Sequence, residues 1–324
     1  MDTNKRFDMS KLLAPAVLVV LYVFFGFFGN NFFSTGSLIN ILDASYFIGF
    51  MAIGVTFVII TGGIDLSLGT TMMCSALLGG MAFNSWQWPM WACLLLVLVV
   101  GSLFGLLNGV LIAYLKLPPF IATLGTQMMG MGIGAILTKV QTMRYPTFGT
   151  PEGWFKNLFY KTKEGLPVGA IWLVLFFLIA WVILNKTSFG RYTYAIGSNS
   201  EAARLSGIKT KRWLTGVYTF CGFFCGIAGI LYAAVYTSII PSTGNGLEVL
   251  GIAGVVIGGT SMTGGSGTLL GTMIGVFIMS VLKQGLMSMG LQAHWQTFFT
   301  GAVVIGAVLL DQYRLKRSAR LTLK

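Results

Sequence analysis

Long runs without a charged residue dominate the chain and alternate with short segments that hold the charges. A helix that spans a membrane needs about 20 apolar residues, and the charge-free runs 66–115 and 249–282 are long enough for two segments each. We expect the first to turn near Asn84–Pro89 and the second to divide at 263–267. The pattern therefore predicts ten membrane segments, at 12–28, 44–62, 67–83, 91–115, 118–138, 168–185, 213–238, 249–262, 268–289 and 294–310.

The composition excludes a soluble enzyme. Hydrophobic residues make up 55% of the 324 residues and charged residues 9%, whereas a soluble domain carries about 25% charged residues. The net charge is +12, but the basic residues lie in short segments between apolar runs and form no stripe of the kind that binds nucleic acid. The fold class predicted is an all-α polytopic membrane protein surrounded by lipid, with residues 1–324 as a single transmembrane domain.

The distribution of Lys and Arg predicts the orientation. An even number of segments places both termini on one side, and cytoplasmic segments carry the excess of basic residues. With the termini cytoplasmic, fifteen Lys and Arg face the cytoplasm, against five in the external loop 139–167. The predicted cytoplasmic parts are the N-terminus 1–11, the loop 186–212 and the basic tail 311–324, besides the short turn at Lys116.

Glycines at four-residue spacing recur in the predicted helices, for example at Gly101, Gly105 and Gly109. Lipid gives helices no hydrophobic reason to associate, so small residues that permit close backbone approach favour contact. These glycines are expected to pack helices within one bundle. A seam for a second subunit is the alternative. Similar runs occur at Gly130 and Gly134, at Gly222 and Gly226, and at Gly267, Gly271 and Gly275.

An ionisable side chain lies between the second and third predicted segments. Asp65 follows Gly62 and Gly63, precedes Ser67, and is the only charge between Asp43 and Lys116. A charge at membrane depth costs about 2.5–3.5 kcal/mol on insertion scales. Either Asp65 or Ser67 caps the helix that follows, or these residues form part of a translocation path or gate, and the two roles are compatible.

A second glycine-rich interruption resembles the first. Residues 57–70 align with 255–268 at an offset of 198, and each reads as an apolar segment, a glycine-rich break and a new helix. Interrupted segments at corresponding positions of two halves indicate a transport pathway, although chance similarity between glycine-rich stretches is the alternative. The second break adds candidate path or gate residues at Gly258, Gly259, Thr260 and Ser261.

The loop 186–212 contains the signals of a short helix. Ser198, Asn199 and Ser200 are helix-starting residues, Glu201 is favourable near the positive end of the helix dipole, and Gly207 is a typical stop. We expect a helix at about 200–206 across the cytoplasmic face. A loop that only fixes topology needs no such helix, so we interpret it as a docking element for a cytoplasmic partner.

Five motifs occur in a fixed order along the chain. They are Gly-Gly-Ile-Asp-Leu-Ser (62–67), Pro-Phe-Ile-Ala-Thr-Leu-Gly (119–125), Gly-Arg-Tyr-Thr-Tyr-Ala-Ile-Gly-Ser-Asn (190–199), Glu-Ala-Ala-Arg-Leu-Ser-Gly-Ile (201–208) and Val-Val-Ile-Gly-Gly-Thr-Ser-Met-Thr-Gly-Gly (255–265). Together they resemble the membrane permease subunit of bacterial ABC sugar importers of the ribose/galactose/xylose type. The resemblance covers about residues 30–315.

The resemblance implies a multi-pass protein of the bacterial cytoplasmic (inner) membrane that imports a monosaccharide or similar small solute by alternating access. An extracytoplasmic sugar-binding protein delivers the solute, and two permease subunits, identical or homologous, form the pathway. A separate cytoplasmic ABC ATPase uses the ATP. The ATPase coupling loop that the resemblance implies comprises Asn199, Glu201, Ala202, Ala203, Arg204 and Gly207.

The chain departs from the family at Leu250, where such permeases often carry an aspartate. The missing charge weakens assignment to one sugar and is compatible with a non-identical partner subunit. We expect no cofactor on this chain, no catalytic residues and no metal site, since the phosphate-binding loop of ATPases is absent and the four cysteines lie in apolar runs.

The alternative is a stand-alone secondary transporter or channel, which usually places ionisable relays inside the membrane. The candidates are Asp43, Asp65, Glu248 and Lys283, of which we expect only Asp65 and Lys283 to lie deep.

Overall fold

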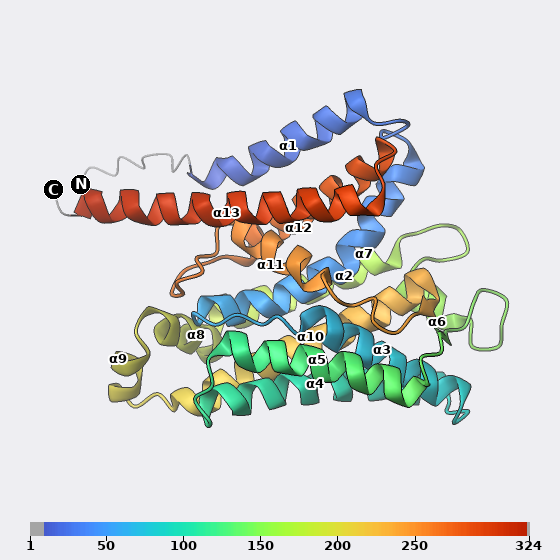
Figure 1. The fold of residues 1–324 in the computed structure, drawn as a ribbon, viewed down its shortest axis with the longest axis horizontal. Coiled ribbons are helices and arrows are strands. Elements are labelled where there is room, and N and C mark those ends of the chain that lie inside the picture. The colour runs from blue at the N-terminus through green and yellow to red at the C-terminus, as the bar shows by residue number, and fades with distance from the viewer. Residues whose placement is uncertain (1–9, 323–324) are drawn as a thin grey trace.

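The computed structural model describes residues 10–322, which form a bundle of helices (Figure 1). Two short strands pair antiparallel, and all other regular structure in this range is helical. The elements are α1 (Ser10–Phe28), α2 (Thr35–Ile60), α3 (Leu68–Asn84), α4 (Met90–Ala113), α5 (Pro119–Thr138), β1 (Met143–Arg144), α6 (Trp154–Phe159), α7 (Val168–Lys186), α8 (Ser188–Ser198), α9 (Ser200–Leu205), α10 (Thr210–Tyr236), β2 (Ser238–Ile239), α11 (Leu247–Ile257), α12 (Leu269–Ser288) and α13 (Ala293–Thr322).

Six of these helices, α2, α4, α5, α7, α10 and α12, are long and apolar enough to cross a membrane. Shorter apolar helices cover Leu13–Phe28 and Leu247–Ile257. The second of these rises only about 16 Å at 1.5 Å per residue, less than the thickness of a bilayer core. Each predicted segment overlaps a helix, and the count of ten crossings remains a prediction.

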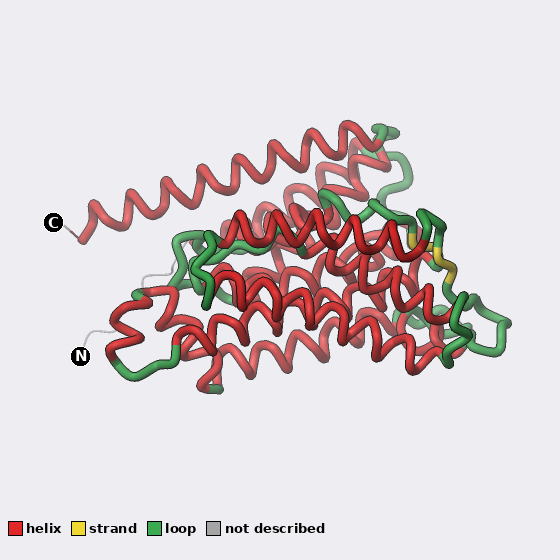
Figure 2. The backbone as a smooth tube through the Cα atoms, turned by 60° about the horizontal axis from the view of Figure 1, so that its bottom comes forward, coloured by secondary structure: helices red, strands yellow, loops and turns green. Residues whose placement is uncertain are grey.

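The two ends of the bundle differ. The start of α1 and the last described turn of α13 lie at the same end as α8 and α9, which we name the α9 end, while α6 lies at the opposite, α6 end (Figure 1). The two strands lie toward the α6 end (Figure 2). Residues 1–9 and 323–324, which belong to the predicted N-terminus 1–11 and tail 311–324, lie outside the described residues. Of the predicted tail, residues 311–322 continue α13 without a break.

Two predicted boundaries are wrong. The helix expected from residue 44 begins at Thr35, where the Ser34 hydroxyl accepts from the backbone N–H of Ser37 at 3.2 Å. The charge of Asp43 suggested a loop, but a hydrogen bond of 3.0 Å from Tyr160 allows the carboxylate to lie within the helix. The loop expected at 186–198 is also helical, because only Thr187 separates α7 from α8.

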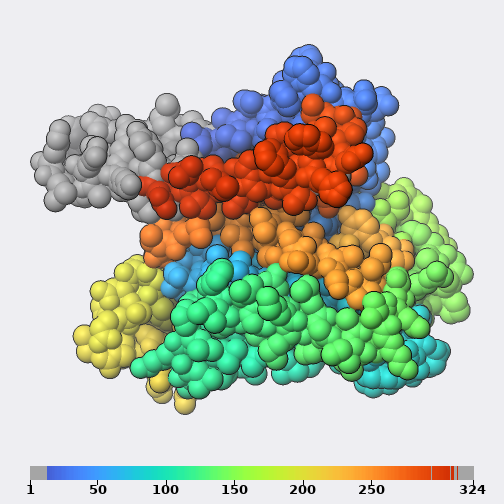
Figure 3. All heavy atoms as spheres, in the orientation of Figure 1, coloured from blue at the N-terminus to red at the C-terminus, as the bar shows by residue number. Residues whose placement is uncertain are grey.

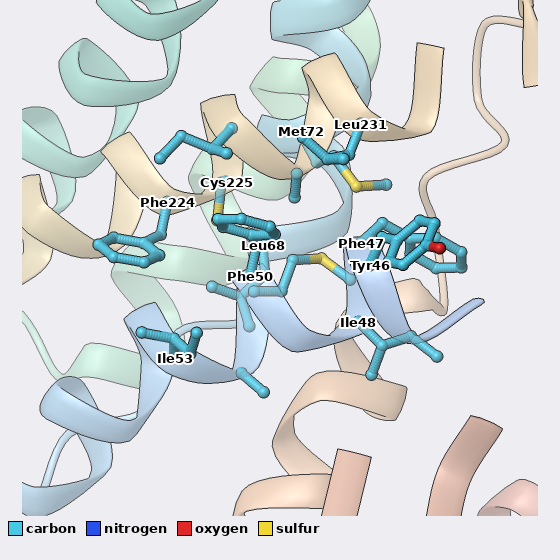
Figure 4. Close-up of a cluster of buried hydrophobic side chains, with 14 of the residues drawn as sticks. Tyr46, Phe47, Ile48, Phe50, Ile53, Leu68, Met72, Phe224, Cys225 and Leu231 are labelled. Carbon is cyan, nitrogen blue, oxygen red and sulfur yellow. The ribbon is translucent and has the colours of Figure 1, made fainter. Parts of the chain in front are cut away.

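Helix α2 forms the centre of the core. Each residue of its apolar stretch is buried, and its side chains face α3 and α10, as the labelled residues of Figure 4 show. Aromatic rings join it to α10, with centroids 4.8 Å apart for Phe57 and Phe220 and 6.1 Å apart for Phe50 and Phe224. Helices α1 and α13 cover one side of the molecule (Figure 3).

The glycine runs pack helices within this bundle, which confirms the first of the two interpretations. Gly101 and Gly105 of α4 meet Gly222 of α10 so closely that a Cβ on Gly222 would overlap the carbonyl oxygen of Gly101. In the same way α12 meets α11, where a Cβ on Gly275 would overlap the carbonyl oxygen of Gly254. Backbone contact of this kind fixes α4 to α10 and α11 to α12.

The substitution Gly105→Ala is expected to lower the midpoint of thermal unfolding in detergent. Its Cβ would overlap the carbonyl oxygen of Tyr218, and overpacking of this kind costs about 1–3 kcal/mol. The matched control is Gly132→Ala on α5, whose Cβ would have no atom within 4 Å. The control should melt at or above the parent temperature, because alanine is the better helix former. Equal melting of the two variants would contradict the packing described.

Candidate functional site

The first break in the bundle covers residues 61–67, between α2 and α3. Gly62 has a φ of +79°, which a glycine adopts without strain, and the N–H of Gly63 returns to the carbonyl of Val58 at 3.1 Å. The chain then turns inward, where the N–H of Leu66 donates to the hydroxyl of Thr123 on α5 at 3.1 Å. Gly62 is therefore exposed, Gly63 is half-buried, and Asp65 and Ser67 are buried.

Asp65 lies in a buried polar cluster that joins three helices. One carboxylate oxygen accepts from the N–H of Ser67 at 2.8 Å and from its hydroxyl at 2.6 Å. The amide of Asn108 on α4 donates to the Ser67 hydroxyl at 2.9 Å and accepts from Thr126 on α5 at 2.6 Å. This chain of hydrogen bonds compensates part of the cost of burying the carboxylate.

The capping prediction holds only for Asp65, since Ser67 occupies the N-cap position of α3 without a capping hydrogen bond from its side chain. Asp65 accepts one free backbone N–H at the start of the helix instead.

The second break, residues 258–268, lies between α11 and α12. Gly258 packs against Gly271 so that a Cβ would overlap the carbonyl oxygen of Gly271, and Gly259 has a φ of +91°. Ser261 is buried and its hydroxyl lies 2.9 Å from that of Thr263. Thr260 is fully buried, and its hydroxyl has no partner among the described residues.

The two breaks touch each other at the α9 end. The N–H of Gly265 donates to the carbonyl of Ile60 at 2.8 Å, and a Cβ on Gly264 would lie 2.9 Å from the nitrogen of Gly62. The order of apolar helix, glycine break and new helix is therefore shared by both, as the alignment predicted. Thr260 and Ser261 belong to the second break alone, and no described hydrogen bond joins either of them to Asp65.

Helix α8 packs against the contact between the two breaks. A Cβ on Gly197 would overlap the carbonyl oxygen of Ile60 and lie 2.7 Å from the nitrogen of Gly265. The hydroxyl of Tyr194 donates to the carbonyl of Gly267 at 2.8 Å. We name this meeting of Ile60, Gly197 and Gly264–Gly265 the glycine junction. Helix α8 ends at Ser198, and α9 begins at Ser200.

Helix α9 confirms the predicted short helix. The side chain of Asn199 accepts from the N–H of Ala202 at 2.9 Å, and Gly207 ends the helix with a φ of +86°. Glu201 and Arg204 are exposed and form an ion pair at 2.6 Å, and the guanidinium holds the pKa of Glu201 below its usual range. Ala203 is buried, while Ala202 and Leu205 are exposed. Figure 3 shows this segment in yellow at one end of the molecule.

The prediction that only Asp65 and Lys283 lie deep in the membrane stays a prediction, because burial inside the protein does not measure membrane depth. Two further acidic residues are nevertheless buried within the bundle. Asp43 is 8% exposed and Glu248 5% exposed. Glu248 accepts from the amide of Gln127 on α5 at 3.0 Å and from the N–H of Gly246. Leu250, where the family often has an aspartate, is buried. The acidic residue of α11 is Glu248 instead.

Sequence reasoning missed the partners of the buried acids. Asn108, Thr126 and Gln127 are polar residues in apolar helices, which is a usable signal because polar side chains inside a membrane are rare. Their pairing is not readable from the sequence, since Asn108 is 41 positions from Ser67 and Gln127 is 121 positions from Glu248. Gly197 was also missed as a contact of both breaks.

Comparison with known proteins identifies permeases of import systems as relatives of the chain. Residues 37–308 match the family model described as branched-chain amino acid transport system / permease component. The chain is 39% identical to the ribose import permease of Bacillus subtilis (strain 168), over 96% of this chain and 94% of the relative. It is 34% identical to the fructose import permease of Rhizobium meliloti, over 94% and 85%. No solved structure matches the chain.

The chain belongs to this permease family. A further relative is the autoinducer 2 import system permease of Salmonella typhi, 36% identical over 95% of this chain and 86% of the relative. The resemblance to ABC importer permeases is thereby confirmed, and the permease is a protein of the bacterial cytoplasmic membrane.

The permease variant Gly197→Ala is expected to be less stable than the parent and to transport more slowly, because its Cβ would push Ile60 and Gly265 apart. The cost should be about 1–3 kcal/mol, read as the thermal midpoint in detergent and as solute uptake by cells. Gly216→Ala on α10 is the matched control, since the nearest atom to its Cβ would be 3.5 Å away. A Gly197→Ala variant with parental stability and uptake would show that the junction tolerates separation.

Proposed function

We propose that the chain is the permease subunit of an ATP-driven importer that carries a monosaccharide or similar small polar solute by alternating access. The relatives named as ribose and fructose import permeases support the sugar class. In this proposal two permease subunits, identical or homologous, form the pathway, an extracytoplasmic binding protein delivers the solute, and a cytoplasmic ABC ATPase supplies the energy. The ten membrane segments with cytoplasmic termini belong to the same proposal.

The observation that carries the proposal is the position of α9. Its outer side presents Glu201, Ala202, Arg204 and Leu205, and Leu205 is 74% exposed. An exposed leucine beside an ion pair suits a groove on a partner protein, where apolar and charged contacts combine. Because α8 connects α9 to the glycine junction, a displacement of α9 by the ATPase acts directly on both breaks of the bundle.

In this proposal the two breaks are the parts of the bundle that change arrangement during transport. Alternating access requires two arrangements of the bundle whose balance the ATPase shifts. Helix interruptions inside a transporter are typical of the substrate path. We assign Gly62, Gly63, Asp65 and Ser67 together with Gly258, Gly259, Thr260 and Ser261 to this path or its gate. The chain itself binds no ATP and no metal in this proposal.

The substitution Glu201→Lys is expected to remove the ATPase from the complex purified in mild detergent from native membranes, as read by mass spectrometry. The change reverses a charge on the exposed side of α9, whereas surface ion pairs add little to stability, so the permease should still fold. Glu164→Lys makes the same charge change on an exposed residue of the segment between α6 and α7. This control should keep the ATPase.

The charge exchange Glu201→Arg with Arg204→Glu separates docking from folding. It restores an ion pair within α9 but presents the charges in reversed order, so it should also lose the ATPase. A chain that purifies alone under gentle conditions, or that transports in vesicles without an ATPase, would contradict the coupling and favour a stand-alone transporter.

Asp65→Asn tests the path. The amide oxygen of asparagine can still accept from the N–H and hydroxyl of Ser67, so the fold should persist while the charge is lost. We expect uptake to fall roughly tenfold, which corresponds to about 1.4 kcal/mol in the barrier, with the amounts of permease and co-purified ATPase unchanged. Unchanged uptake would show that the charge of Asp65 has no transport role.

A further inference from the structure

A cavity of about 140 Å³ lies near the α6 end of the bundle, far from α9. Three helices form its walls. Helix α2 contributes Asn40 and Asp43, α10 contributes Tyr236, and α12 contributes Lys283, Gln284 and Met287. An engineered cavity of about 150 Å³ in another protein holds benzene, so this space suits one five- or six-membered ring. A disaccharide is too large for it.

Asp43 lines the cavity and carries one carboxylate oxygen without a hydrogen-bond partner. One carboxylate oxygen accepts from Tyr160 at 3.0 Å. The other is buried and has no hydrogen-bond partner within residues 10–322. A buried carboxylate oxygen without a partner is costly, and a donor supplied by a ligand removes that cost.

Lys283 provides the opposite charge in the same cavity without neutralising Asp43. Among the described residues the Glu201–Arg204 pair is the one ion pair, and the ammonium of Lys283 lies 5.3 Å from the centre of the Phe47 ring. The ammonium supplies donors only, and the carboxylate acceptors only. The amides of Asn40 and Gln284 offer both.

This combination selects the chemistry of the ligand. A simple anion is repelled by the Asp43 carboxylate, and a simple cation by Lys283 and by Lys156 and Lys161, whose charges also act on Asp43. A hydroxyl group, in contrast, donates to a carboxylate and accepts from an ammonium. We propose that the cavity binds one sugar ring or a polyol of similar size, with hydroxyl groups placed between Asp43 and Lys283. The sugar class rests on the proposed function, and the cavity is a site additional to the two breaks.

The position of the cavity agrees with an entry site. Asp43 lies in the third turn of α2, and Tyr236 is the last residue of α10. Tyr160, which holds Asp43, belongs to the segment between α6 and α7 that the charge distribution predicts to be external. A solute released at this face meets the cavity before it reaches the breaks at the α9 end.

Protection of an introduced thiol tests the proposal on the purified full-length permease. The natural cysteines Cys74, Cys93, Cys221 and Cys225 are all buried, so Met287→Cys adds an exposed thiol at the cavity. We expect D-ribose or D-fructose to slow maleimide labelling of this thiol several-fold. Met289→Cys is the matched control, because Met289 is also exposed but does not line the cavity.

A second substitution in the same chain tests whether protection of the thiol depends on Asp43 and Lys283. In the Met287→Cys background, Asp43→Asn and Lys283→Met should each abolish the protection, while the thermal midpoint shows whether the variant remains folded. Folded variants that keep full protection would overturn the assignment of Asp43 and Lys283. Protection by L-leucine and not by either sugar would overturn the polyol class in favour of a zwitterion.

The labelling assay needs neither ATPase nor transport, so its outcome is separate from that of the coupling experiments. A permease complex that imports ribose or fructose while neither sugar protects the thiol would overturn the cavity site alone. A permease protected by sugar that transports without an ATPase would keep the cavity site and overturn the ATP-driven function.

Discussion

A backbone hydrogen bond between Gly265 and Ile60 joins the two interruptions of the bundle. Inside a membrane protein every backbone donor and acceptor must find a partner within the protein, and each break exposes groups that a continuous helix would pair internally. The breaks meet this constraint by contact with each other and with α8. The absence of a side chain at Gly197 follows from that contact, because any Cβ there would overlap the Ile60 carbonyl.

The same constraint explains how three carboxylates are buried. Asp65 is paired by a serine and an amide network, and Glu248 by Gln127 and a backbone N–H. Neutral donors stabilise a buried charge without a second ion, which avoids the cost of desolvating a counterion as well. Asp43 differs from both, since only one of its oxygens has a partner in the described chain. Of the three acids, Asp43 is therefore the one that keeps an unpaired carboxylate oxygen.

The apolar pattern was sufficient to locate the helices, because about 20 apolar residues have few alternatives to a helix in lipid. It failed at Asp43, a charged residue that suggested a loop although it lies within α2. Asp43 concealed the first turns of α2 because its compensation by Tyr160 comes from 117 positions away. The helix α9 was predicted in full, since Asn199 and Gly207 act locally. The glycine junction was not, because its contacts join residues from three distant parts of the chain.

Helices α2 and α12 connect the two ends of the permease. Helix α2 leads from Asp43 to the first break, and α12 leads from the second break to Lys283. The hydroxyls of Thr56 and Thr272, 2.9 Å apart, join the two helices nearer the breaks. At about 1.5 Å per residue, α2 is a rod of about 39 Å, and close packing on all sides prevents it from bending freely. In the proposed alternating access, a rotation of α2 against α12 that begins at the glycine junction would therefore change the separation of Asp43 and Lys283 at the other end. The geometry gives this pair of helices both the contact with α8 and the charged walls of the cavity.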